Sequence, residues 1–219
     1  MKLLGIDTAT EACSVALAGV GDTILERYKI EPKGHSNLVL PMIDDLLSDS
    51  GISHNDLDAI AVDTGPGSFT GIRIGIGIAQ GLSFGLKLPL IGISSLMVLA
   101  EGSEPTVSAV LPAIDARMGE VYWGRLVRDQ ETVEGWAWRS RPCVTKPSLL
   151  PVLENDEIGV GSGWEKYIEA IETNTMAEIK TGVFPRAIWL VAIAARAIVS
   201  DLNFGSSAIP QYIRNNIVD

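Results

Sequence analysis

A glycine-rich turn between an apolar strand and an apolar helix constrains this chain more than any other feature. Residues 63–75 read DTGPGSFTGIRIG and follow the apolar run Leu57–Val62, and a further strand is expected over Leu88–Ile93. This strand, turn and helix order is typical of α/β folds. Each glycine inside a helix costs about 1 kcal/mol relative to alanine. Close packing must offset that cost at Gly71, Gly75, Gly77, Gly81 and Gly85.

The residues before this turn predict a β-meander and then an amphipathic helix. Strand-like segments joined by short turns, as in antiparallel hairpins, cover Lys2–Thr8, Ala12–Ala18 and Thr23–Ile30. Aspartates then alternate with apolar residues at three- and four-residue spacing, which predicts a helix with Ser36 as its N-cap and an end near Gly51. The apolar positions of this helix are Leu38, Val39, Met42, Ile43, Leu46 and Leu47.

The second half of the chain repeats this order of elements. Residues 107–115 and 120–127 predict a hairpin, and a third strand is expected around Trp136. A short strand over residues 157–160 leads into a Gly-Ser-Gly turn and a helical segment over residues 164–173.

Two landmarks suggest that the chain is duplicated. An Ile-Asp pair ends the first strand of each half, at Asp7 and at Asp115, and a Gly-x-Gly turn follows the fourth strand of each half. We therefore predict an α/β fold with duplicated mixed sheets and helices, in two lobes at residues 1–104 and 105–219. The C-terminal tail is expected to pack back on the first lobe.

The composition argues against several classes of protein. Seventeen basic and 27 acidic residues give a formal charge of −10, which is not the basic footprint of a nucleic-acid binder. Cys13 and Cys143 lie far apart without metal-ligand spacing, so both are interpreted as buried free thiols. Residues 71–90 form the most lipophilic run, but Arg73 and Lys87 interrupt it, so we predict a soluble protein. No secretory leader is recognised, and the cytoplasm is the expected location.

Several strings together resemble the bacterial TsaB family, also called YeaZ. They are ACSVAL, HSNLVLPMIDDLL, GPGSFTGIRIG, DARMGEVYW, GSGW and IPQYIR, and they extend from residue 12 to residue 214. The resemblance implies the two-lobed fold of the actin, Hsp70 and sugar-kinase (ASKHA) superfamily. It also implies a function as a non-catalytic scaffold and activating subunit in threonylcarbamoylation of adenosine 37 in tRNAs that read codons beginning with A. The implied partners are the catalytic paralogue TsaD and the ATPase TsaE, with tRNA bound only through the complex.

The same resemblance gives weak candidates for nucleotide contacts and no catalytic or metal-binding residue. The stretch Gly5–Leu17 resembles the first phosphate hairpin of the superfamily, but its turn contains threonine and alanine in place of glycine. The weak candidates are Asp7, Thr8, Gly65 and Gly67. The metal-binding His-x-x-x-His of TsaD falls on Ser95 and Leu99 in this chain. No cofactor is therefore expected on this chain alone, and binding of ATP or ADP is left to the complex.

The glycine helix is interpreted as a contact surface as well as a structural element. Its glycines form two stripes, and we expect the helix to be buried almost all round, partly by a second protein chain. The predicted partner interface comprises Leu38, Met42, Leu46, Gly71, Gly75, Gly77 and Gly81. A homodimer is expected for the chain alone. The alternatives to a scaffold are a degenerate phosphotransferase of the same superfamily and a peptidase-like enzyme.

Overall fold

A mixed sheet of five strands forms the core of the first lobe in a computed structural model that describes all residues except 155, 173–177, 201–207 and 214–219. The strands follow the order β3-β2-β1-β4-β5, with β1 antiparallel to β2 and parallel to β4. Their bounds are Leu3–Asp7 for β1, Ala12–Ala18 for β2, Leu25–Ile30 for β3, Ala59–Asp63 for β4 and Leu90–Ile93 for β5.

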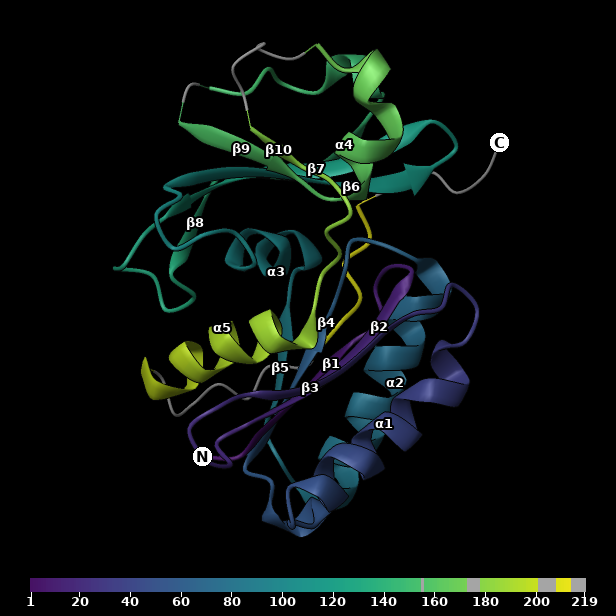
Figure 1. Ribbon diagram of the computed structural model, residues 1–219, viewed down its shortest axis with the longest axis vertical. Helices are drawn as coiled ribbons and strands as arrows, with labels where there is room; N and C mark the ends of the chain where they lie inside the picture. The colour runs from purple at the N-terminus through teal and green to yellow at the C-terminus, as the bar shows by residue number, and fades with distance from the viewer. Residues whose placement is uncertain (155, 173–177, 201–207, 214–219) are drawn as a thin grey trace.

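Helices cover both faces of this sheet (Figure 1), because its central strands are apolar on both sides. On one face, α1 (His35–Asp49) and α2 (Phe69–Leu86) pack over residues such as Leu4 and Ile6. On the other face, α5 (Ala187–Ser200) packs over Leu3 and its neighbours, and α3 (Ser95–Glu101) lies between α5 and the second sheet. The sequence analysis does not predict α3 or α5. Helix α1 begins after Gly34, so Ser36 is not its N-cap as expected but lies inside the first turn.

The second lobe contains another five-stranded sheet, in the order β10-β9-β6-β7-β8. Written from the other edge this order is β8-β7-β6-β9-β10, which matches β3-β2-β1-β4-β5 strand for strand and confirms the duplicated α/β fold. The bounds are Ala109–Arg117 for β6, Glu120–Arg128 for β7, Trp136–Thr145 for β8, Glu157–Val160 for β9 and Ile179–Lys180 for β10. Helix α4 (Ser162–Tyr167) follows β9 as α2 follows β4, and short 3₁₀ turns lie at His54–Asp56, Pro147–Leu149 and Ile168–Ala170.

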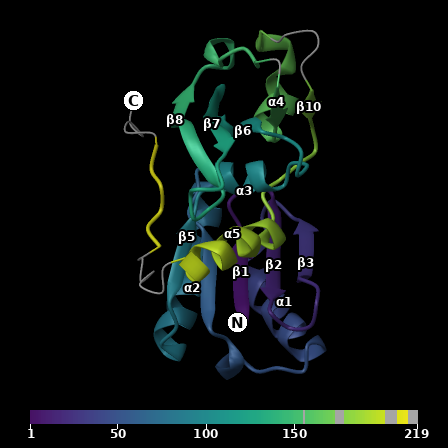
Figure 2. The same cartoon turned by 90° about the vertical axis from the view of Figure 1, so that its left-hand side faces the viewer.

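Parts of the second half of the chain lie against the first lobe. The strands of the first sheet precede the loop between α3 and β6, and those of the second sheet follow it. Helix α5 comes later in the chain but packs on β1 and β2 of the first sheet. Residues 208–213 also return to the first lobe, where the Gln211 amide donates to the Thr64 carbonyl (2.8 Å) and the Gln80 side chain donates to the Ala208 carbonyl (3.0 Å). Figure 2 shows this segment beside β5 and β8, along one side of both lobes.

Neither cysteine forms a disulfide, but only one thiol is fully buried. Cys13 lies in the core, as expected, whereas Cys143 in β8 is half-exposed. None of the helices in the described part of the chain combines the length and the apolar character that crossing a membrane requires.

Candidate functional sites between the lobes and on the glycine helix

The turn after β1 and the glycine turn after β4 are locked together by backbone contacts. The Ser68 amide donates to the Ala9 carbonyl (2.7 Å), and the Thr8 hydroxyl donates to the Gly71 carbonyl (2.7 Å). A Cβ atom at Gly67 would lie 2.1 Å from the Ala9 oxygen, so only glycine permits this approach. Thr8 is therefore committed to an internal hydrogen bond, which does not support its candidacy as a phosphate ligand.

Two buried carboxyl groups lie side by side beneath these turns. Asp7 ends β1 and Asp63 ends the neighbouring parallel strand β4, and their exposed fractions are 0% and 2%. Oδ1 of Asp7 accepts from the Ala9 amide (3.1 Å), and Oδ1 of Asp63 accepts from the Gly65 amide (2.7 Å) and the Ser95 hydroxyl (2.5 Å). The two Oδ2 atoms receive no hydrogen bond from any other described group. A proton shared between the carboxyl groups is therefore needed to satisfy them.

Burial controls the ionisation of this pair. Desolvation raises the pKa of Asp7 well above its ordinary 3.8, and the Asp63 charge raises it further. Desolvation also raises the pKa of Asp63, to about 6, although the hydrogen bonds from Ser95, Gly65 and Asp7 oppose that shift. Burial of both groups thus favours a proton shared between them. Asp7 is fully buried and accepts from the Ala9 amide in the following turn, which favours a turn-stabilising role over the nucleotide contact for which it is a candidate.

Replacing Asp7 by asparagine is expected to remove a pH-dependent loss of stability. Both pKa values are raised on folding, so the stabilisation is fully present below pH 3.8 and is lost as the pH rises through about 6 and beyond. As the pH rises from 3.8, the variant should gain unfolding free energy relative to wild type, because its asparagine has no buried proton to lose.

Denaturant unfolding at a series of pH values measures this difference. The exposed Asp45→Asn change on α1 is the matched control for removing one carboxylate charge. A flat profile for Asp7→Asn would mean that the two carboxyl groups do not share a proton.

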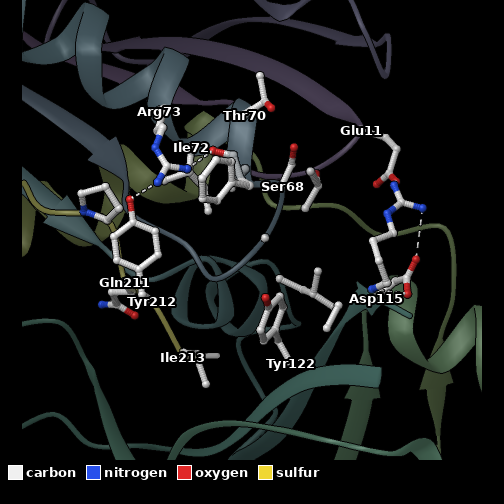
Figure 3. A pocket seen from close by; sticks show the side chains of 18 residues that line it. Glu11, Ser68, Thr70, Ile72, Arg73, Asp115, Tyr122, Gln211, Tyr212 and Ile213 are labelled. Carbon is white, nitrogen blue, oxygen red and sulfur yellow. Dashed lines mark hydrogen bonds and ion pairs between the residues drawn. The ribbon is translucent and has the colours of Figure 1, made fainter. Parts of the chain in front are cut away.

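A pocket of about 410 Å³, here called the interlobe pocket, opens above these turns (Figure 3). Its first wall is the turn at residues 9–11 together with residues 67–73 at the start of α2. Its second wall comes from residues 114–117 and Tyr122, and residues 210–213 form the third. Of the four weak nucleotide candidates, only Gly67 lines this pocket, whereas Asp7, Thr8 and Gly65 do not.

Arg73 forms the polar corner of the interlobe pocket (Figure 3). Its guanidinium lies 3.2 Å from the centroid of the Phe69 ring and donates to the Tyr212 hydroxyl (2.5 Å) and the Phe69 carbonyl (3.1 Å). From the sequence, a solvated position is favoured for Arg73 and Arg214 over a specific ion pair or hydrogen bond. The structure instead gives Arg73 a partner 139 residues away, Tyr212, whereas Arg214 lies outside the described residues.

The opposite corner is an ion-pair network that joins the lobes. Arg117 pairs with Glu11 of the first lobe and, at 3.2 Å, with Asp115 of the second. Asp115 also accepts from Lys166 (2.7 Å) and Tyr167 (2.9 Å). Burial opposes ionisation of Asp115, but the hydrogen bonds from Lys166, the Arg117 amide and Tyr167 outweigh it and hold the pKa below its ordinary value. Asp115 thus has a structural role.

The two glycine stripes of α2 have different environments, which corrects the expectation of a helix buried all round. A Cβ atom at Gly71 would lie 2.1 Å from the Thr8 carbonyl oxygen, and one at Gly75 would lie 2.4 Å from the Thr8 hydroxyl oxygen. At Gly77, Gly81 and Gly85, no described residue outside the adjoining helix backbone has an atom within 4 Å of such a position. Gly71 and Gly75 are therefore packed inside the protein and do not belong to an open interface.

The α1 residues predicted for the same interface also differ in how deeply they are buried. Leu46 is fully buried and cannot meet another chain, because α1 packs that position against the first sheet. Leu38 and Met42 are half-buried at the edge of this core. Exposed large apolar side chains on the two helices are Leu40, Phe69 and Phe84, none of which is in the interface predicted from the sequence.

The positions aligned with the TsaD metal ligands are both buried in α3. Ser95 donates its hydroxyl to Asp63, and Leu99 packs in the core shared by the two lobes. His35 contacts the Ala12 carbonyl (3.2 Å), whereas the exposed His54 lies 3.5 Å from Asp44. Within the described ranges, no three His, Cys, Asp or Glu side chains are grouped as metal ligands.

Comparisons with known proteins identify the family. Residues 28–147 match the family model of TsaD, tRNA N6-adenosine threonylcarbamoyltransferase. The chain is 40% identical to the tRNA threonylcarbamoyladenosine biosynthesis protein TsaB of Escherichia coli (strain K12), over 99% of this chain and 96% of that protein. It is 38% identical to TsaB of Haemophilus influenzae, over 99% and 95%. The solved structure of YeaZ from Pseudomonas aeruginosa superposes with a TM-score of 0.85 at 37% identity, over 96% of this chain and 99% of that one. Near-complete coverage at this level of identity shows that the chain belongs to the TsaB (YeaZ) family of tRNA threonylcarbamoyladenosine biosynthesis proteins.

Proposed function

We propose that this chain is a non-catalytic scaffold and activating subunit for threonylcarbamoylation of adenosine 37 in tRNAs that read codons beginning with A. Its proposed partners are a TsaD-like catalytic paralogue and a TsaE-like ATPase, in the cytoplasm. The pathway follows from family membership. The accessory role is supported by the burial of Ser95 and Leu99 at the positions aligned with the TsaD metal ligands.

The main support for a scaffold role is the exposed outer face of α2. Gly77, Gly81 and Gly85 carry the helix-propensity cost of glycine without packing against any other part of the described chain to offset it. Phe84 on the same helix is 89% exposed. A smooth glycine stripe beside an exposed aromatic ring suits close packing of a second helix, supplied by the TsaD-like partner or, for the chain alone, by a second copy.

Nucleotide and tRNA contacts are assigned to the complex. The first turn is filled by Thr8 and Ala9, and the Thr8 hydroxyl is already bonded to Gly71. The formal charge of −10 opposes binding of tRNA to the isolated subunit. ATP or ADP in the interlobe pocket would require groups from a partner, and tRNA is held only through the assembly.

Reconstitution tests the proposal directly. The purified chain alone should neither hydrolyse ATP nor modify tRNA. The TsaD-like and TsaE-like proteins should form threonylcarbamoyladenosine only at background level without this chain and clearly above background once it is added. Mass spectrometry of digested tRNA and phosphate release measure the two activities.

Two outcomes would instead support the enzymatic alternatives. Steady ATP turnover by the chain alone, lost in Asp7→Asn, would favour a degenerate phosphotransferase. Peptide hydrolysis by the chain alone would favour a peptidase, a label that one similar solved structure from Pseudomonas aeruginosa carries by resemblance to YeaZ.

A further inference from the structure

A second hollow, of about 380 Å³ and here called the β8 pocket, lies between the lobes where the β5–α3 junction faces β8. Its walls include Ser94 and Met97 from the first lobe and Glu134, Trp138 and Arg141 from the second. Figure 2 shows β5, β8 and residues 208–213 on the same side of the molecule, and Gln211 from this segment contributes to both pockets.

Trp138 has a fixed position because β7 has a glycine beneath it. A Cβ atom at Gly124 would lie 2.7 Å from the edge of the Trp138 indole, so the ring packs directly over the glycine backbone. The ring is half-buried and joins the core shared by the lobes. It thus forms a rigid aromatic wall of the β8 pocket.

A β-bulge places Arg141 beside this wall. Trp123 pairs with Cys143 and Arg125 pairs with Ser140, so Arg141 and Pro142 together face the single residue Gly124. Such bulges redirect a side chain out of the regular alternation of a strand. Arg141 is exposed and, among the described residues, its guanidinium makes no hydrogen bond or ion pair, whereas the neighbouring Arg139 pairs with Glu154 (2.7 Å).

Glu134 supplies the opposite charge in the same pocket. Its carbonyl accepts from Arg196 (2.8 Å), which ties this part of the loop to α5. Within the described part of the chain, its carboxylate has neither a hydrogen-bond donor nor an ion-pair partner on record. Glu134 and Arg141 therefore line one pocket with opposite charges that do not neutralise each other, on either side of Trp138 in the chain.

We propose that the β8 pocket binds a free α-amino acid, with its carboxylate on Arg141, its ammonium group on Glu134 and its carbon skeleton against Trp138. A zwitterion supplies both missing counter-charges at once, which neither a simple anion nor a simple cation does. The buried Ser94 hydroxyl, which has no hydrogen-bond partner among the described residues, is a further polar group at this wall. The inference is independent of the scaffold role proposed above, because it needs no second protein.

Titration of the isolated full chain with L-threonine and glycine, followed by NMR, tests this assignment. The Trp138 indole resonance, identified with Trp138→Phe, should shift saturably with a dissociation constant in the millimolar range. Arg141→Gln and Glu134→Gln should each weaken L-threonine binding about tenfold or more, the size expected for losing a charge-assisted hydrogen bond. Arg139→Gln and Glu131→Gln, which remove matched charges nearby, should leave binding within about twofold of wild type.

Ligands that lack one of the two charged groups test the contributions of Glu134 and Arg141 separately. N-acetyl-L-threonine lacks the ammonium group, so its binding should be weak and insensitive to Glu134→Gln but still reduced by Arg141→Gln. L-threonine methyl ester should show the reverse dependence. Absence of saturable shifts, or equal losses in the Arg139→Gln and Glu131→Gln controls, would overturn the proposal. Thermal melting of each variant checks that the fold is kept.

Discussion

Replacing Gly71 by alanine is expected to lower the free energy of unfolding by about 3 kcal/mol, at the upper end of the range for overpacking a core. The added methyl group would lie 2.1 Å from the Thr8 carbonyl oxygen, and a backbone atom cannot move aside as a flexible side chain does. The shift would also disturb the hydrogen bond from the Thr8 hydroxyl to the Gly71 carbonyl. Chemical denaturation with two spectroscopic probes measures the loss.

Gly77→Ala is the matched control in the same helix. Nothing lies within 4 Å of its added methyl group, so only helix propensity changes, and the variant should be stabilised by about 0.5–1 kcal/mol. If Gly71→Ala lowers the free energy of unfolding and Gly77→Ala raises it, the stripe that contains Gly71 is the one that faces the sheet. If Gly71→Ala unfolds like the wild type, α2 does not pack on the turn after β1 as described.

Replacing Gly81 by leucine is expected to weaken binding to the TsaD-like partner by tenfold or more, which corresponds to about 1.4 kcal/mol. The exposed glycine has no neighbour within 4 Å, so a leucine there fits the isolated chain but obstructs a close helix crossing. Calorimetric affinity is measured on this variant, together with the melting temperature of the isolated chain at a dilution at which it is monomeric. The melting temperature should change little.

Glu169→Leu, an exposed apolar substitution in the second lobe, serves as the control and should leave affinity unchanged. Unchanged partner binding by Gly81→Leu would show that the outer stripe is not the interface. A collapse of monomer stability would show instead that this stripe packs within the chain.

Local pattern was sufficient for most elements of the fold. Period-two and helical spacings predicted β1 to β3 and α1, and the repeated order of elements predicted two sheets with one topology. The pattern missed α3 and α5, because helices that are apolar nearly all round lack the alternation that marks an amphipathic helix. Without such a pattern, the sequence does not predict that α5 packs on the first sheet.

The sequence by itself determined that α2 has two glycine stripes and that the chain belongs to a duplicated α/β family, since both follow from residue spacing and shared motifs. Only the tertiary structure decided which stripe is internal, because a helical repeat does not say which face meets a sheet. Likewise, Asp7 and Asp63 lie side by side only because parallel pairing of β1 and β4 brings residues 56 positions apart into one buried space. Contacts between such distant residues depend on how strands pair, and no local pattern encodes that pairing.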